Sequence, residues 1–207
     1  MEPAAVVDEI VALEWDMFSR VHNAGGPASC QMAPNTFSAM RRSQFLAWDE
    51  ATRASYLNDL RAAGEQGRNL STEKYARMMA STHPDEYAAI APSLPPLAPE
   101  AVRLAEEIVA AQLRWKAELN EKYPHLAERG RPLRSAEDSP QATSFETYAR
   151  AELQTYSPET LRRYRAHIER RLREGTSEAE DNLLNQVRAY GYADLAAADR
   201  AAAAQTR

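Results

Sequence analysis

Apolar residues recur at intervals of three and four along most of the chain, which is the spacing of one face of an α-helix. The first such stretch, over 6–21, carries Ile10, Leu13, Met17 and Val21. A glycine–proline segment at 24–27 should end this helix. By the same reasoning we expect further helices over 35–48, 49–64, 71–83, 85–90, 100–121, 143–155, 158–173 and 178–190.

The predicted helix starts carry residues that favour an N-cap. Asp49 and the Ser157-Pro158 pair are the strongest of these signals, and Asn35 or Thr36 would cap the helix that ends at Trp48. Residues 122–142 hold glycine, proline, serine and arginine and are expected to form a loop.

The chain divides at its one proline-rich stretch, residues 92–99, which is typical of a stiff linker. We therefore expect a first helical unit over 1–97 and a second over 98–192. The alanine-rich tail, 193–207, favours a helix but offers little to pack, so we expect it to fray. The two units are expected to pack together as one globular domain.

The two units also resemble each other in sequence. Asp8-Glu9-Ile10-Val11-Ala12 recurs as Glu106-Glu107-Ile108-Val109-Ala110, 98 residues later. Six further pairs are 108 residues apart: Phe37 and Phe145, Arg42 and Arg150, Trp48 and Tyr156, Thr52 and Thr160, Tyr56 and Tyr164, and Gly67 and Gly175. The offset changes only in a loop, which favours an internal duplication over accidental helical periodicity.

The fold class predicted from these patterns is all-α. We expect a helical bundle of two similar repeats around a pseudo-two-fold axis, with a ligand cleft between them.

Composition narrows the classes of function. The 207 residues carry a net charge of −5, which disfavours nucleic acid as a partner because a nucleic-acid footprint needs a basic stripe. The single cysteine excludes a disulfide framework and an all-cysteine metal site. No apolar run is long enough for a membrane span, and the acidic N-terminus lacks the basic start of a signal peptide. We therefore expect a cytoplasmic protein with no membrane partner.

Several segments together resemble an uncharacterised bacterial family, domain-of-unknown-function family 4125. The motifs include Gly25-Gly26-Pro27-Ala28-Ser29-Cys30-Gln31 and Met40-Arg41-Arg42-Ser43-Gln44-Phe45-Leu46-Ala47-Trp48. The longest match is Arg129-Gly130-Arg131-Pro132 followed by Thr143-Ser144-Phe145-Glu146-Thr147-Tyr148 and Glu152-Leu153-Gln154-Thr155-Tyr156-Ser157. The resemblance extends over about residues 6–192. It implies no activity, since the family has no assigned function.

The predicted helix over 143–155 has one polar face, formed by Glu146, Tyr148, Arg150 and Glu152. Arg42 and Gln44 occupy the positions equivalent to Arg150 and Glu152 in the first half. Because arginine binds carboxylates through two parallel hydrogen bonds, we expect Arg42 and Arg150 to clamp a carboxylate in one cleft. Glu146 or Glu152 would then hold an ammonium or act as a base, and Tyr148 would act as an acid or hydrogen-bond donor. Ion pairs on a solvated helix face are the alternative.

Two loops complete the candidate site. Cys30 lies in the glycine–proline loop beside Gln31, and a thiol near arginine side chains is reactive. A small buried cysteine is the alternative interpretation. Arg131 and its neighbours are a candidate anion loop, with solvated arginines as the alternative. We assign Cys30, Glu146, Tyr148 and Glu152 as candidate catalytic residues, and the candidate substrate-binding residues are Arg42, Arg150, Gln31, Gln44 and Arg131.

The leading hypothesis is a small-molecule enzyme that acts on a carboxylate-bearing or amino-acid-like substrate by lyase-type or redox chemistry. A non-catalytic helical binding or regulatory module is the first alternative, and a metal-dependent enzyme using Cys30 and His22 is the second. No nucleotide or flavin motif is present, so the sequence assigns no cofactor, and a mononuclear metal is one option. The expected partner is a small anionic or zwitterionic molecule, and a homodimer remains open.

Overall fold

The computed structural model describes residues 3–22, 26 and 29–205, without the side chains of Pro3, Ser29 and Cys30. Within these residues the chain is all-helical, with no β-strand, as the sequence predicts. The α-helices are α1 (Pro3–Ser19), α2 (Pro34–Ala47), α3 (Glu50–Glu65), α4 (Leu70–Thr82), α5 (Pro84–Ile90), α6 (Pro99–Lys122), α7 (Pro124–Ala127), α8 (Phe145–Leu153), α9 (Pro158–Arg173), α10 (Glu178–Ala189) and α11 (Leu195–Gln205). Three short 3-10 helices, η1 (Ser29–Met32), η2 (Ala91–Ser93) and η3 (Ser135–Glu137), lie between them.

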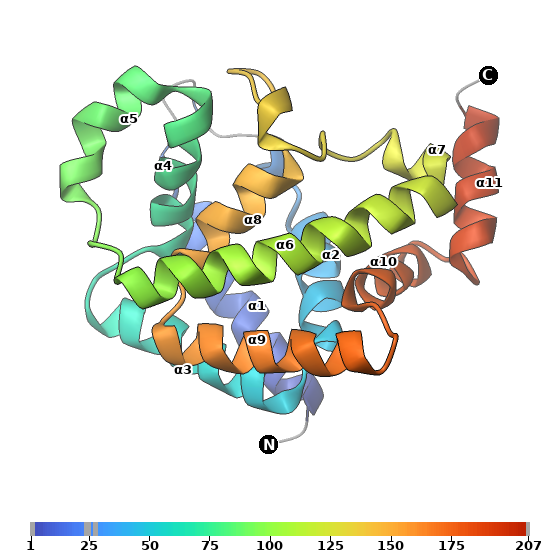
Figure 1. Cartoon of the computed structure of the whole chain (residues 1–207), viewed down its shortest axis with the longest axis horizontal. Coiled ribbons are helices and arrows are strands. Elements are labelled where there is room, and N and C mark those ends of the chain that lie inside the picture. Colours follow the sequence, from blue (N-terminus) through green and yellow to red (C-terminus); the bar gives the residue numbers. More distant parts are fainter. Residues whose placement is uncertain (1–2, 23–25, 27–28, 206–207) are drawn as a thin grey trace.

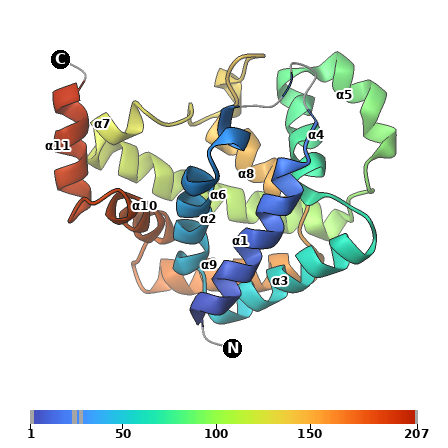
Figure 2. The ribbon, with the colours of Figure 1, turned by 180° about the vertical axis from the view of Figure 1, so that it is seen from behind.

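The helices pack in two layers. In Figure 1 the long α6 crosses the front of the molecule with α9 below it, and in Figure 2 α1 and α2 cover the opposite face. α6 contacts α8 and α9, while α1 contacts α2 and α3. The halves of the chain also interleave, because α4 packs on α8 and α10 packs on α2. The boundaries of the two units and their pseudo-two-fold relation stay predictions.

Side-chain caps explain where several helices begin. Asp49 accepts a hydrogen bond from the amide of Thr52, and Ser157 accepts one from the amide of Thr160, as the sequence predicts. The start of α2 was predicted wrongly. This helix begins at Pro34 without a side-chain cap, since the fixed φ of proline suits the first helical turn. The expected loop over 122–142 contains α7 and η3.

The main hydrophobic core lies where α1, α2, α3, α6, α8 and α9 meet. Its largest fully buried side chains are Tyr164, Phe45, Ile10, Leu60, Leu104 and Ile108. Trp48 and Trp115 are buried in this core, whereas Trp15 is half-buried. None of the described helices is both long enough and apolar enough to cross a membrane.

The prediction that the tail frays is wrong. α11 buries Leu195, Ala198 and Ala202, and Leu195 and Ala198 belong with Val187 to a second, smaller core. The carboxylate of Asp199 accepts a hydrogen bond of 2.9 Å from the amide of Leu126, at α7. The tail is ordered because α7 and α10 provide the apolar surface that composition alone does not reveal.

Candidate functional site

Four charged side chains meet in the interior, and we call them the ion cluster: Glu14 of α1, Arg41 of α2, Lys74 of α4 and Glu152 of α8. Arg41 connects the two carboxylates. Its Nε lies 2.6 Å from Glu14 Oε2, and its Nη2 and Nη1 lie 3.1 and 3.2 Å from Glu152 Oε1 and Oε2. None of the four side chains is more than 11% exposed. The two positive and two negative charges balance, which is the condition for burying ions at acceptable cost.

Neutral hydrogen-bonding groups complete the ion cluster. The hydroxyl of Tyr56 donates to Glu14 Oε1 over 2.7 Å, and the hydroxyl of Tyr156 donates to Glu152 Oε1 over 2.9 Å. Gln44 accepts from Arg41 over 2.8 Å and donates to Glu152 over 3.2 Å. Each carboxylate oxygen of the cluster therefore has a donor, as buried polar groups require.

Lys74 extends the cluster to Tyr148. Its Nζ donates to Glu152 Oε2 over 3.2 Å and to the Tyr148 hydroxyl over 2.9 Å, and it lies 4.5 Å from the centre of the Tyr148 ring. The guanidinium of Arg131 lies over the same ring, with Cζ 4.8 Å from its centre. Two cations thus converge on one tyrosine, one half-buried and one exposed.

Electrostatics hold these groups in their charged or neutral forms. Burial alone would raise the pKa of Glu152, but the charges of Arg41 and Lys74 outweigh it and keep that pKa well below its usual range. Burial would likewise lower the pKa of Lys74, but Tyr148 and Glu152 raise it above its usual value. Burial and the neighbouring carboxylates raise the pKa of Tyr56 and Tyr156. At neutral pH Glu152 and Lys74 are therefore charged, and Tyr56 and Tyr156 are neutral.

The closed ion cluster leaves little space. A cavity of about 10 Å³ adjoins Glu14, Tyr56, Lys74 and Glu152. This is close to the minimum volume for one water molecule. A substrate-sized ligand does not fit beside the cluster in this conformation.

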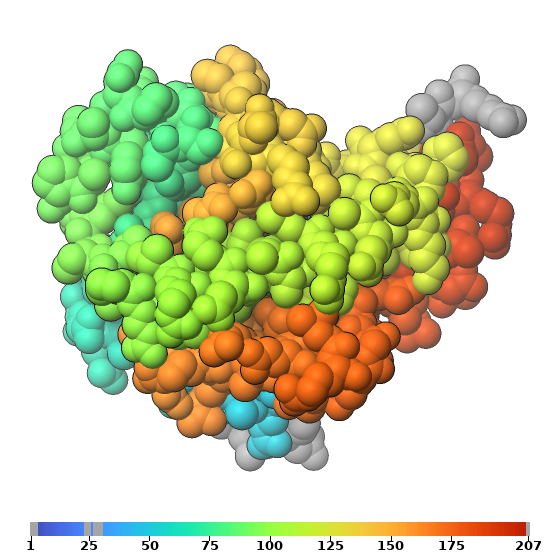
Figure 3. All heavy atoms as spheres, viewed as in Figure 1, coloured from blue at the N-terminus to red at the C-terminus, as the bar shows by residue number. Residues whose placement is uncertain are grey.

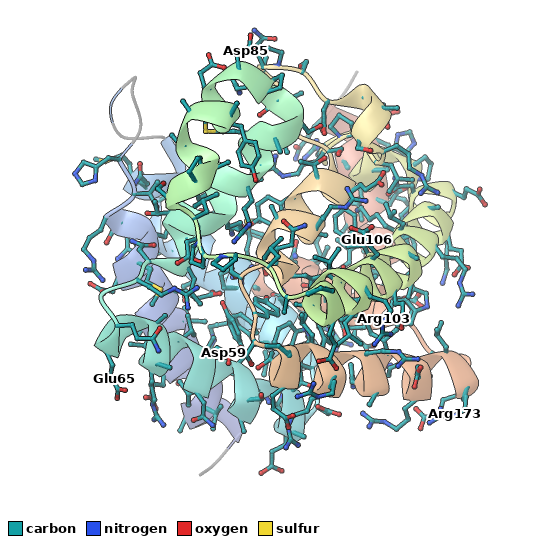
Figure 4. All side chains as sticks on the ribbon, turned by 60° about the vertical axis from the view of Figure 1, so that its left-hand side comes forward. Asp59, Glu65, Asp85, Arg103, Glu106 and Arg173 are labelled. Atoms are coloured by element: carbon teal, nitrogen blue, oxygen red, sulfur yellow. The ribbon has the colours of Figure 1, made fainter. Side chains whose placement is uncertain are left out.

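Four candidate residues from the sequence analysis lie together: Gln44, Tyr148 and Glu152 at the ion cluster, and Arg131 at its edge. The expected clamp of Arg42 and Arg150 does not form. Arg42 pairs with Asp8, and Arg150 pairs with Glu146 and with Glu106, which Figure 4 labels on α6. Successive helical residues are turned by about 100°, so Arg41 points inward and Arg42 does not.

The remaining candidates lie elsewhere or outside the description. Glu146 accepts from the amide of Ser135 over 3.0 Å and so holds the loop before α8. Gln31 donates to the carbonyls of Phe18 and Val21 and ties η1 to the end of α1. The Cys30 side chain lies outside the described part, so its role stays a prediction. His22 is exposed, and the described side chains include no group of three histidine, cysteine or acidic residues that would hold a metal ion.

Sequence reasoning missed Glu14, Arg41, Tyr56, Lys74 and Tyr156. One signal was available for Glu14, which stands four residues after Ile10 and three before Met17 and is thus a carboxylate on an apolar face. Arg41 stands four residues before Phe45 in the same way. A charge at a core position of an amphipathic helix indicates a buried ionic partner.

Residues 4–200 match the model of a family described as a protein of unknown function, DUF4125. The chain belongs to this family. The match spans nearly the whole chain, so the DUF4125 family model includes every helix that contributes to the ion cluster. No curated protein and no solved structure matched in the other two comparisons.

Proposed function

We propose that this DUF4125 protein is a small-molecule enzyme whose substrate carries a carboxylate and resembles an amino acid. The substrate would bind at the outer edge of the ion cluster, where Lys74, Arg131 and Tyr148 meet. The observation that carries the proposal is the state of Arg131. Its guanidinium lies over the Tyr148 ring and donates to the carbonyl of Thr143 over 3.1 Å, and it forms no ion pair with any described carboxylate.

An arginine in this state is suited to bind an anion. The ring and the carbonyl orient the guanidinium, and the remaining N–H donors suit the two oxygens of a carboxylate. Lys74 adds a second positive charge 4.5 Å from the same ring. Arg42 and Arg150, by contrast, already have carboxylate partners.

Tyr148 is the candidate acid. Its hydroxyl oxygen accepts a hydrogen bond from the Lys74 ammonium over 2.9 Å, so its own proton can be donated to a substrate atom. Proton donation of this kind suits a lyase-type reaction. Glu152 is a poor base because its pKa lies well below neutrality, and we assign it instead to hold Lys74 and Arg41 in position.

We further propose that the two halves are related by duplication around a pseudo-two-fold axis. Equivalent contacts recur in support. Tyr56 donates to Glu14 over 2.7 Å, and the equivalent Tyr164 accepts from Gln112 over 2.8 Å. The rings of Tyr56 and Tyr156 lie 4.6 Å apart at 46°, and those of Tyr164 and Trp48 lie 4.5 Å apart at 43°.

The duplication bears on function because the charges of the ion cluster are not repeated. The positions equivalent to Glu14, Arg41, Lys74 and Glu152 are Gln112, Ala149, Asn182 and Gln44. Since burial of ions is costly, and the equivalent positions are uncharged, packing of this fold does not itself demand the four charges. The four charges occur at only one of each pair of equivalent positions, which supports a binding or catalytic role for the ion cluster.

A non-catalytic binding module is the second candidate. It is favoured by the pKa values of Lys74 and Glu152, because the first is raised and the second is lowered, both away from neutrality. A catalytic acid or base needs a pKa near the working pH, whereas a binding group does not. For either function we propose a cytoplasmic location, since a single cysteine and a net charge of −5 suit that compartment.

The experiment is a thermal-shift and calorimetric titration with small carboxylates, including succinate and L-glutamate. A binding carboxylate should raise the melting temperature. The Arg131→Ala variant should weaken this binding about 10- to 100-fold, because a charged hydrogen-bond donor is lost. Arg134→Ala, in the same loop and also exposed, is the matched control and should bind as the native protein does.

A second variant separates the two candidate functions. Tyr148→Phe keeps the ring under Arg131 and removes only the hydroxyl. For an enzyme, turnover should fall about 100- to 10,000-fold while binding is retained. Binding without turnover of any bound carboxylate would favour the binding module. Equal affinity of Arg131→Ala and native protein would refute the site.

A further inference from the structure

We propose that α4 and α5 form a lid over the ion cluster, and that the lid opens at the seam between α4 and α8. This inference rests on the proposed function, since it explains how a ligand reaches the site. The cavity at the closed cluster measures about 10 Å³. That cavity does not extend to Tyr148. Because the Lys74 side chain is only 11% exposed, a carboxylate-bearing ligand can reach its ammonium together with Tyr148 only if one of the covering helices moves.

The segment from α4 to the start of α6 is weakly anchored to the hydrophobic core. Leu70 and Ala101 both belong to the main core, and Met78 is the one buried hydrophobic residue between them. Every residue between them lies in the described part, and none belongs to either hydrophobic cluster. α5 has no buried residue at all. Segments with few buried apolar contacts open locally at lower free energy than the core does.

Hydrogen bonds between polar side chains cross the seam. Lys74 bonds Tyr148 and Glu152 across it, and farther along α4 the hydroxyl of Ser81 donates to the carboxylate of Asp138 over 2.5 Å. Water can replace such contacts on opening, so their net contribution to closure is small. Arg77 donates to the carbonyl of Pro95 over 2.7 Å, which ties α4 to the segment between η2 and α6.

The start of α4 provides the pivot. Leu70 is in the core, and the Asn69 side chain donates to the carbonyl of Met17 over 2.8 Å while it caps α4. The far end of the lid has no residue in either hydrophobic cluster and is tied to the loop before α8 by the bond from Ser81 to Asp138. In Figures 1 and 3 α4 and α5 project from one end of the molecule, and in Figure 4 Asp85 lies at the tip of this projection.

The test uses the three lysines of the chain, Lys74, Lys116 and Lys122. Lys74 is 11% exposed and covered by the seam, whereas Lys122 is 58% exposed. Acetic anhydride should label Lys122 at once and Lys74 slowly, at a rate set by lid opening. Mass spectrometry measures both rates in the intact, ligand-free protein.

Two serine variants are compared. Ser81→Ala removes the bond to Asp138 and should accelerate labelling of Lys74 roughly 3- to 10-fold, as loss of one such hydrogen bond predicts. Ser93→Ala is the control, since its hydroxyl bonds only the carbonyl of Ile90 within the lid segment, and it should change nothing. Amide hydrogen exchange over 71–90 should be at least about 10-fold faster than in α1 and α6.

Equal labelling of Lys74 in Ser81→Ala and native protein would overturn the lid. So would exchange over 71–90 at the rate of α1 and α6, because opening would then require global unfolding. Neither measurement uses a ligand. The lid proposal can therefore be refuted even if succinate or L-glutamate binds, and it can hold even if neither of them binds.

Discussion

Removal of the Arg41 guanidinium should destabilise the protein more than any surface arginine substitution. Arg41 donates to both Glu14 and Glu152, and its loss leaves two buried carboxylates with only Lys74 as a cation. Breaking a buried ion pair from one side costs about 3–5 kcal/mol. For a chain of this length, about 2–4 °C is lost per kcal/mol, so the melting temperature of Arg41→Met should fall by about 6–20 °C.

The free energy is measured by urea unfolding at pH 7 and the melting temperature by thermal unfolding, both followed by tryptophan fluorescence. Arg42→Met is the matched control, because Arg42 is the adjacent residue and its pair with Asp8 is exposed. An exposed pair contributes about 0–1 kcal/mol. The double variant Arg41→Met/Glu152→Gln restores charge balance between Glu14 and Lys74. It should cost about 0.5–3 kcal/mol less than the sum of the two single variants.

The pH dependence gives an independent check of the same reasoning. In Arg41→Met the buried carboxylates lose their main cation, so burial favours their protonated forms. The difference in stability between the variant and native protein should therefore shrink between pH 7 and pH 4. A cost below about 1 kcal/mol at pH 7, or strictly additive costs in the double variant, would refute the charge-coupled cluster.

Three other predictions concern stability. The pKa of Glu152 and that of Asp49 are lowered in the folded state, so native stability should be present above the unfolded values near 4 and fall as pH drops through acid, measured by urea midpoints from pH 7 to 3. Burial alone would lower the pKa of His167, but Asp49 and Glu178 raise it above 6.5. The stability that His167 contributes is therefore present below pH 6.5 and is lost as pH rises through the folded pKa. His167→Gln should flatten the change in unfolding free energy between pH 6 and 9. Leu195→Ala should lower the free energy of unfolding by about 2–5 kcal/mol in calorimetry, since Leu195 is buried in the second core. A loss below about 1 kcal/mol would instead support a frayed tail.

Local sequence determined the helices and many of their ends. Apolar spacing alone locates α6 and α9 to within a few residues, because a buried helix face needs a side chain every three or four positions. Asp49 and Ser157 cap their helices as expected, since a cap depends on residues only three positions apart. The sequence also identified the family, which the match over 4–200 confirms. It identified Gln44, Tyr148, Glu152 and Arg131 as candidates without indicating what joins them.

Tertiary structure decided which charges are buried and which are solvated. Arg41 and Arg42 are adjacent and chemically identical, and only the packing of α2 against α1 and α10 turns the first inward and the second toward Asp8. Glu14 and Glu152 are far apart in sequence, yet both bond Arg41. The alanine-rich tail is ordered for the same reason, because α7 provides its partner surface. Helix periodicity depends on neighbours along the chain, whereas the free energy of a buried charge depends on partners that only the folded arrangement brings within hydrogen-bond distance.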